Sequence, residues 1–262
     1  MALVDHLREL RYRVIVSVLG VVLGGAVCAI FYTHVLAVAL HPFERAAAAY
    51  RAADPTAKVN LSLNSVTDPF SLVIWIMVVA GLILSCPVWL YQLWAFIAPA
   101  LLKNEKKIAL IFIGSATPLF LGGVTLGYFV LPKGIEVLLG FTPSGFGVVN
   151  LLEMRKFLEF ELVMLLVFGL SFLLPVVLIS LNVVGVVRGY QLGKARKGVI
   201  FGTVVFAAVA TPSTDPFSLL ALATPMTVLY FLSEIICRAN DKRRGVTPES
   251  IAEFQIDVDK DT

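Results

Sequence analysis

Six long apolar runs, separated by polar segments, dominate the pattern of this 262-residue chain. A helix needs about 20 predominantly apolar residues to cross the hydrocarbon core of a bilayer. Most of the runs reach that length, so the pattern predicts an all-α integral membrane protein with six transmembrane helices. The runs are Val14–Val35, Phe70–Tyr91, Ile108–Leu131, Phe157–Val184, Val199–Ala210 and Phe217–Cys237.

The fifth run is the exception, because its residues from Val199 to Ala210 would span only about 18 Å as a helix. A short turn, Thr211-Pro212-Ser213-Thr214-Asp215-Pro216, joins it to the sixth run. We therefore expect the last two helices to be short, with the mismatch relieved by bilayer thinning or by assembly. The alternative is a fifth helix that begins near Arg196 and extends its basic side chains to the interface.

The positive residues fall mostly on one side of the predicted helices. Fifteen of the 21 Lys and Arg residues lie in the segments that alternate crossings place with the two termini, and six lie in the opposite segments. Cytoplasmic loops carry the excess of Lys and Arg. The bias predicts a multi-pass protein of the plasma (cytoplasmic) membrane whose N- and C-termini are both cytoplasmic.

Two long segments, about Leu36–Pro69 and Pro132–Lys156, fall on the outer side, and we expect them to form a loop cap over the outer helix ends. Prolines inside apolar runs tend to kink helices, which favours a concave bundle. These prolines are Pro87, Pro118, Pro175 and Pro225. The expected architecture is a single six-helix membrane domain over residues 1–240, followed by a polar, disordered cytoplasmic tail over 241–262.

Composition supports lipid as the solvent. The chain is 58% hydrophobic and 15% charged, with a mean hydropathy of +0.89, whereas soluble domains are about half apolar and about a quarter charged. The net charge of +3, without a basic patch that interleaves aromatics, argues against a nucleic-acid partner.

The three cysteines are unclustered, so we expect no metal site, disulfide framework or cofactor. The sequence contains neither HExxH nor G-x-S-x-G, and we do not expect an enzyme.

Two glutamates stand inside basic segments on the predicted cytoplasmic side. Glu9 lies in His6–Arg13, just before the first run, and Glu105 lies in Lys103–Lys107, between the second and third runs. Acidic residues at these places weaken the positive topology signal, so they require another explanation. We predict that the two carboxylates receive cationic side chains from a partner.

Four motifs follow one another along the chain: His6-Leu7-x-Glu9-Leu10-Arg11-x-Arg13, the stretch Pro87–Leu101 with Glu105 after it, Phe168-Gly169-x-Ser171-Phe172-x-x-Pro175, and Thr211-Pro212 followed by Asp215-Pro216-Phe217-Ser218. In residues and spacing they resemble the TatC family, the multi-spanning receptor subunit of the twin-arginine protein translocase. The resemblance extends from Asp5 to about Arg238. It implies a receptor for Arg-Arg signal peptides of folded exported proteins. It also implies a multimeric complex with single-span TatA/TatB-type subunits and energy from the proton-motive force.

The candidate signal-peptide site is built on Glu9 and Glu105, with Arg13 beside Glu9. Guanidinium is a planar fork that matches two carboxylate oxygens, which favours Arg over Lys. For Glu9 the alternative role is an i,i+4 pair with Arg13. For Glu105 it is a pair with Lys106 or Lys107, or an acid favoured at a helix N-terminus.

Two ion pairs contribute a few kcal/mol, whereas micromolar binding needs about 8 kcal/mol. We expect the remainder from the apolar stretch of the signal peptide, packed against a helical groove. The groove candidates are Trp94, Phe96 and Leu101.

Glu159 and Glu161 open the fourth run from the outer side. Many TatC members have an acid further along this helix, where this chain has Leu173, so the role of that acid cannot be transferred by position. Glu159 lies about 40° from the same helical face. A displaced polar site is possible, but we favour an interfacial acid paired with Lys156.

Three further polar residues, Thr211, Asp215 and Ser218, mark the junction where the resemblance implies contact with single-span partners. Leu219 replaces a polar residue common in the family, and Asp215 could equally cap the sixth helix. Gln92, at the inner end of the second run, is a candidate for the groove or for an interfacial anchor.

A proton- or ion-coupled secondary transporter of a small solute is the alternative function. Such transporters show internal repeats and mid-membrane ionisable residues on broken helices. No repeat is evident in this chain, and its strong acids lie near the ends of the apolar runs.

Overall fold

The computed structural model describes residues 3–53, 58–97, 105–142, 149–211 and 215–245, with side chains for all of these except 3–6, 97 and 105–109. This part of the chain forms nine helices and two short strands. In order they are α1 (Leu3–Ile30), α2 (Tyr32–Ala53), β1 (Lys58–Ser62), α3 (Asp68–Leu84), α4 (Cys86–Ile97), α5 (Glu105–Gly140), β2 (Val149–Glu153), α6 (Met154–Ser171), α7 (Leu174–Val184), α8 (Gly189–Ala210) and α9 (Pro216–Arg243).

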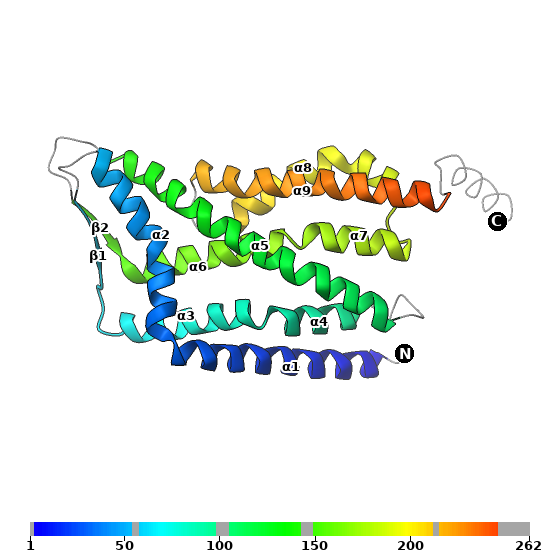
Figure 1. The fold of residues 1–262 in the computed structure, drawn as a ribbon, viewed down its shortest axis with the longest axis horizontal. Helices are drawn as coiled ribbons and strands as arrows, with labels where there is room; N and C mark the ends of the chain where they lie inside the picture. Colours follow the sequence, from blue (N-terminus) through cyan, green and yellow to red (C-terminus); the bar gives the residue numbers. More distant parts are fainter. Residues whose placement is uncertain (1–2, 54–57, 98–104, 143–148, 212–214, 246–262) are drawn as a thin grey trace.

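The long helices run roughly along one axis, with a cap at one end (Figure 1). α1 packs along α3 and α4, α5 packs on α6, α2 and α4, and α9 packs on α7 and α8. α1 begins and α9 ends at the end opposite the cap (Figure 1). The predicted helical membrane fold is therefore confirmed.

Membrane-spanning length is reached by the apolar stretches Leu7–Ile30, Leu110–Gly140, Met154–Val184 and Pro216–Arg243. α3 and α4 together add a fifth span if the pair, bent by 63° at Ser85, is counted as one crossing. Within the described residues, α8 does not meet the same criterion, since its first half carries basic residues. The count of six crossings thus stays a prediction.

The last two helices are longer than their apolar runs. α8 has 22 residues and α9 has 28, so only the apolar part of α8 is short. α8 begins at Gly189, seven positions before Arg196, which agrees with the alternative of a helix extended by its basic end. The expectation of two short helices is therefore wrong for the helices as a whole, because basic side chains do not interrupt backbone hydrogen bonding.

Two of the four prolines expected to kink helices begin new helices, and the other two lie inside continuous ones. Pro87 and Pro175 each stand in the first turn of a new helix, α4 and α7, directly after a break. Pro118 and Pro225 lie inside the continuous helices α5 and α9. The N–H groups of the first turn have no intrahelical acceptor, so a proline there loses no hydrogen bond and marks a helix start.

The cap contains more regular structure than the two expected loops. α2 crosses over α3 and α5, and the end of α5 extends to Gly140. β1 and β2 pair in parallel, with Asn60 opposite Leu151. The long segments therefore form a helix and a two-stranded sheet, and β1 joins β2 across nearly a hundred residues of chain.

Candidate functional site

The candidate peptide site begins with a link from α1 to α4. Arg13 donates to Oε1 of Glu9 from Nε at 3.1 Å and from Nη2 at 2.5 Å. Its Nη1 lies 3.5 Å from Oε1 of Gln92. The side chains of Arg13 and Glu9 are 19% and 25% exposed. The i,i+4 pair offered as the alternative for Glu9 is present, and Gln92 anchors it on α4.

Glu105 is the first residue of α5 and stands at the end opposite the cap, where α1 begins and α4 ends (Figure 1). A carboxylate in the first turn of a helix interacts favourably with the helix dipole. The side chain of Glu105 and the whole of Leu101 lie outside the described residues, so their roles stay predictions.

Trp94 faces the interior rather than an open groove. Its side chain is 4% exposed, and its ring stacks on Phe112 of α5 with centroids 4.2 Å apart. Phe96, two residues further on, is half-buried. Trp94 therefore packs between α4 and α5. Any peptide contact in this turn would involve the more exposed residues beside it.

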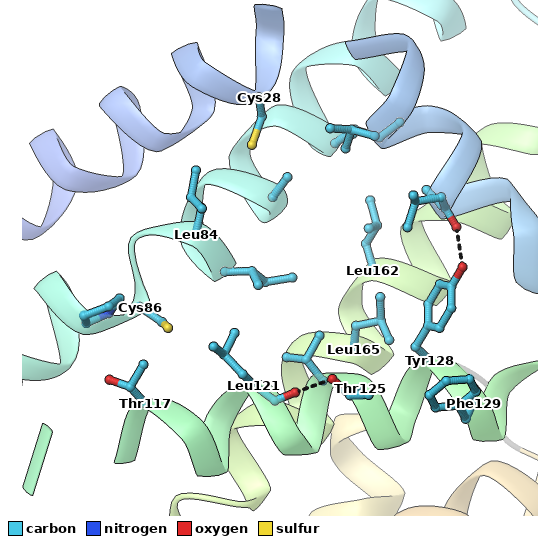
Figure 2. Close-up of a pocket in the computed structure, with 18 residues that line it drawn as sticks. Cys28, Leu84, Cys86, Thr117, Leu121, Thr125, Tyr128, Phe129, Leu162 and Leu165 are labelled. Carbon is cyan, nitrogen blue, oxygen red and sulfur yellow. Dashed lines mark hydrogen bonds between the residues drawn. The ribbon is translucent and has the colours of Figure 1, made fainter. Parts of the chain in front are cut away.

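A large apolar cavity, open on one side to the surface, lies between the helices (Figure 2). It has a volume of about 550 Å³ and is lined by residues of α1 through α6. The Tyr128 hydroxyl on its wall donates to the Val38 carbonyl at 3.0 Å, and Thr125 donates to Leu121 at 2.7 Å. This cavity agrees with the predicted concave bundle, and its apolar lining would accommodate apolar groups.

Glu161 and Glu159 have opposite environments on α6. Glu161 is 0% exposed, and neither of its carboxylate oxygens has a hydrogen-bond partner among the described residues. Glu159 is exposed. Lys156 pairs with Glu153 at 2.8 Å, three residues earlier, which corrects the expected pair of Lys156 with an acid of the fourth run. Glu153 and Glu159 are each three positions from Lys156, so sequence spacing does not distinguish them, and the structure pairs Lys156 with Glu153.

At the junction of α8 and α9, the described polar groups bond within the chain. Asp215 is the N-cap of α9 and accepts from the Ser218 backbone N–H at 2.7 Å. Thr211 and Ser218 are both 7% exposed, and the Thr211 hydroxyl donates to the Ala207 carbonyl at 2.8 Å. The capping role considered for Asp215 is present, and apolar neighbours supply the exposed surface here.

Two buried acids that sequence reasoning missed hold α7, α8 and α9 together. Glu234 is 1% exposed and accepts from Arg196 twice at 2.7 Å and from Arg238 at 2.7 Å. Asp241 accepts from the Gly189 backbone N–H at 2.6 Å and from Asn182 at 2.8 Å. The i,i+4 spacing of Glu234 and Arg238 was visible in the sequence, whereas the partner on α8 was not.

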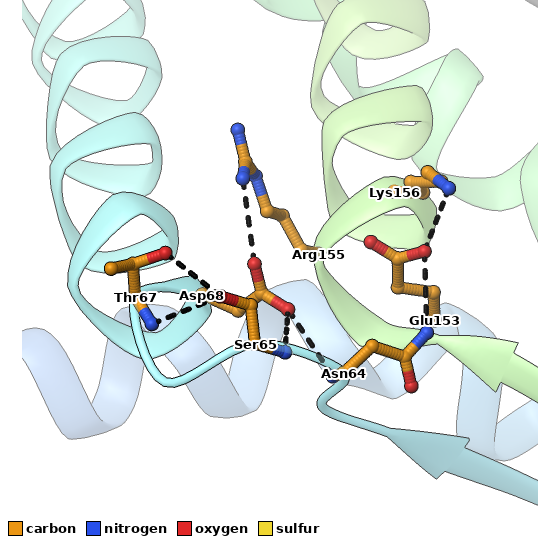
Figure 3. A network of polar contacts seen from close by, with 7 residues as sticks. All are labelled: Asn64, Ser65, Thr67, Asp68, Glu153, Arg155 and Lys156. Atoms are coloured by element: carbon orange, nitrogen blue, oxygen red, sulfur yellow. Dashed lines mark hydrogen bonds and ion pairs between the residues drawn. The ribbon is translucent and has the colours of Figure 1, made fainter.

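A polar network fixes the cap to α3 and α6 (Figure 3). Asp68, 3% exposed, accepts from the backbone N–H groups of Ser65 at 2.8 Å and Asn64 at 3.2 Å. Its other oxygen lies 3.4 Å from the Arg155 guanidinium. Asn64 also donates to Glu153 at 3.4 Å. The turn before α3 is thereby tied to the start of α6.

A concave bundle of membrane-length helices, a folded cap and a polar end opposite it define a multi-spanning helical membrane protein. The family model described as Sec-independent protein translocase protein (TatC) matches residues 5–225. The chain belongs to the TatC family, whose members are components of Sec-independent protein translocation.

Relatives and solved structures agree with this assignment. Sec-independent protein translocase protein TatC of Frankia casuarinae is 39% identical over 246 residues, covering 93% of this chain and 67% of the relative. The Aquifex aeolicus protein of the same name is 32% identical over 89% of this chain and 93% of its own. A crystal structure described as the twin arginine translocase receptor TatC in DDM aligns with a TM-score of 0.75 at 31% identity, over 88% of this chain and 99% of that one.

Proposed function

We propose that this chain is the receptor subunit of a twin-arginine translocase and binds Arg-Arg signal peptides at the end opposite the cap. The observation that carries the proposal is the position of two acids around α4. Glu9 lies at the start of α1 and is linked to Gln92 of α4, and Glu105 begins α5 just after α4 ends. Both acids therefore belong to the same end of the molecule (Figure 1).

The proposed recognition is a forked hydrogen bond from each arginine to a carboxylate. Such a bond contributes about 1.5–3 kcal/mol when sheltered and about 0–1 kcal/mol when fully exposed. Glu9 is three-quarters buried, which places it between these limits. The apolar stretch of the peptide supplies the remainder on exposed residues of α4 and α5, among them Leu93, Leu110 and Ile111.

The same proposal includes a complex in the cytoplasmic membrane that is driven by the proton-motive force. Single-span TatA/TatB-type subunits contact the α8–α9 junction in this complex. The signal-peptide site, at the end opposite the cap, faces the cytoplasm. Side chains exposed at that junction support such a contact, because they offer a surface on which a partner helix can pack by van der Waals contact. They are Val209, Phe217 and Leu220.

Membership of the TatC family favours a protein receptor over the small-solute transporter. Reconstituting this chain alone in liposomes separates the two. We expect no ion-coupled counterflow of small solutes, and such counterflow would support the transporter.

Site-directed photocrosslinking from position 105, in membranes that present an Arg-Arg precursor, tests the proposed site. We expect a crosslink to the precursor, which Lys-Lys in place of Arg-Arg abolishes. In a binding assay with a labelled leader peptide, Glu105→Gln and Glu9→Gln should each weaken binding about five- to tenfold. Glu136→Gln is the matched control, since Glu136 lies near the cap and pairs with Lys133 at 2.9 Å. Unchanged binding by both site variants would remove the receptor assignment.

A further inference from the structure

We propose that Arg13 is an internal stand-in for a signal-peptide arginine, seated on Glu9 until the peptide displaces it. The inference rests on the proposed function and assigns a specificity-determining role to Arg13. In the peptide-free chain the acid that should receive a guanidinium already holds one, through Nε at 3.1 Å and Nη2 at 2.5 Å.

In this geometry only one carboxylate oxygen of Glu9, Oε2, is open to a peptide. Both donors of Arg13 fall on Oε1, and no described residue donates to Oε2. A lysine ammonium, as a point charge, could use the one open oxygen. A guanidinium fork needs both oxygens for its bidentate geometry, so full recognition of arginine requires that Arg13 leave.

The pair is built so that it can exchange. Arg13 and Glu9 are one turn apart on the same helix, and such pairs stabilise a helix only weakly. Both side chains retain access to water, at 19% and 25% exposed. The contact from Arg13 to Gln92 is long, at 3.5 Å, and Gln92 can hold the released guanidinium near α4.

Removing the stand-in should therefore tighten binding. We expect Arg13→Gln to increase the affinity for an Arg-Arg leader peptide about two- to tenfold, because the peptide no longer competes with an internal partner. This part-buried partner is held more strongly than an exposed helical pair and less strongly than a fully sheltered charge-assisted bond. The gain for a Lys-Lys peptide should be smaller, so the preference for Arg over Lys rises. Arg13→Lys, which keeps the charge and loses the fork, should fall between the wild type and Arg13→Gln.

Two comparisons separate displacement from a general effect of charge. Arg8→Gln removes the same charge from an exposed position next to Glu9 and should change affinity by less than twofold. In a Glu9→Gln background, Arg13→Gln should have no effect, because the stand-in acts only through Glu9.

The experiment is a titration of the full chain in lipid nanodiscs with fluorescent Arg-Arg and Lys-Lys leader peptides. Tighter binding by Arg13→Gln that disappears in the Glu9→Gln background supports the proposal. Weaker or unchanged binding by Arg13→Gln overturns it, as does an equal gain in both backgrounds. If Glu9→Gln and Glu105→Gln still weaken binding in those cases, the receptor function stands. If neither does, the receptor function itself fails.

Discussion

Glu161 has the least ordinary environment of the described side chains. It is fully buried on α6 beside Leu162 and Leu165, which line the apolar cavity, and both its oxygens lack donors within the described residues. Burying a polar group without a hydrogen bond costs free energy, and ionisable residues inside membranes are usually retained for function. Glu161 is therefore a candidate for an intramembrane polar site.

We expect Glu161→Leu to raise the melting temperature in detergent. Leucine removes two unsatisfied oxygens, whose burial costs about 1–3 kcal/mol. Glu161→Gln should gain less, because the amide keeps polar atoms in the same place. Glu159→Leu is the control at an exposed site and should change little. A lower melting temperature for Glu161→Leu would mean that water, lipid or a partner satisfies the carboxylate.

Undiminished export by the Glu159→Leu/Glu161→Leu double variant would exclude a transport role.

At the scale of elements, α1 and α3 approach closely at glycines. A Cβ placed on Gly81 would meet the backbone N of Gly25 at 2.5 Å and the carbonyl O of Val21 at 2.6 Å. Small residues let membrane helices approach closely, and this approach positions α4 beside the start of α1. The Glu9–Arg13–Gln92 link depends on that arrangement, so a glycine far from the site sets its geometry.

We therefore predict that Gly81→Ala destabilises the fold by about 1–3 kcal/mol, because backbone atoms must shift to admit the methyl group. Gly114→Ala is the matched control, since a Cβ there meets nothing within 4 Å. Alanine also favours helix over glycine, so the control should be neutral or slightly stabilising. Thermal unfolding of the two variants in one detergent measures the difference. Equal melting temperatures would contradict the close α1–α3 packing.

At the scale of the whole molecule, the cap joins the helices, and the end opposite it carries the acids of the proposed site. The parallel β1–β2 pair and the Asp68 network tie the segments after α2 and α5 to the starts of α3 and α6. The ends of the long helices away from the cap carry Glu9, Glu105 and the acid-centred contacts of α8 and α9 (Figure 1). The contacts of the cap thus hold the elements together at one end, and the proposed peptide site lies at the other.

The distribution of Lys and Arg predicts that the cap lies outside the cell and that both termini lie inside. In a chain without native cysteines, we expect Val66→Cys, at a turn that is 98% exposed in the cap, to react with an impermeant maleimide added outside the cell. Arg8→Cys and Lys242→Cys, at the opposite end, should react only after the membrane is opened. The reverse pattern would place the proposed peptide site on the wrong side of the membrane.

The sequence by itself determined the membrane class, most of the helices and the family, because apolar run length and motif spacing are local properties. Tertiary structure alone decided that Trp94 faces Phe112, that β1 pairs with β2 and that Glu234 has Arg196 as a partner. These contacts depend on which faces of distant segments meet, and no local pattern contains that information. The Glu9–Arg13 pair lies between the two cases: its spacing was readable, but its anchor on Gln92 required the fold.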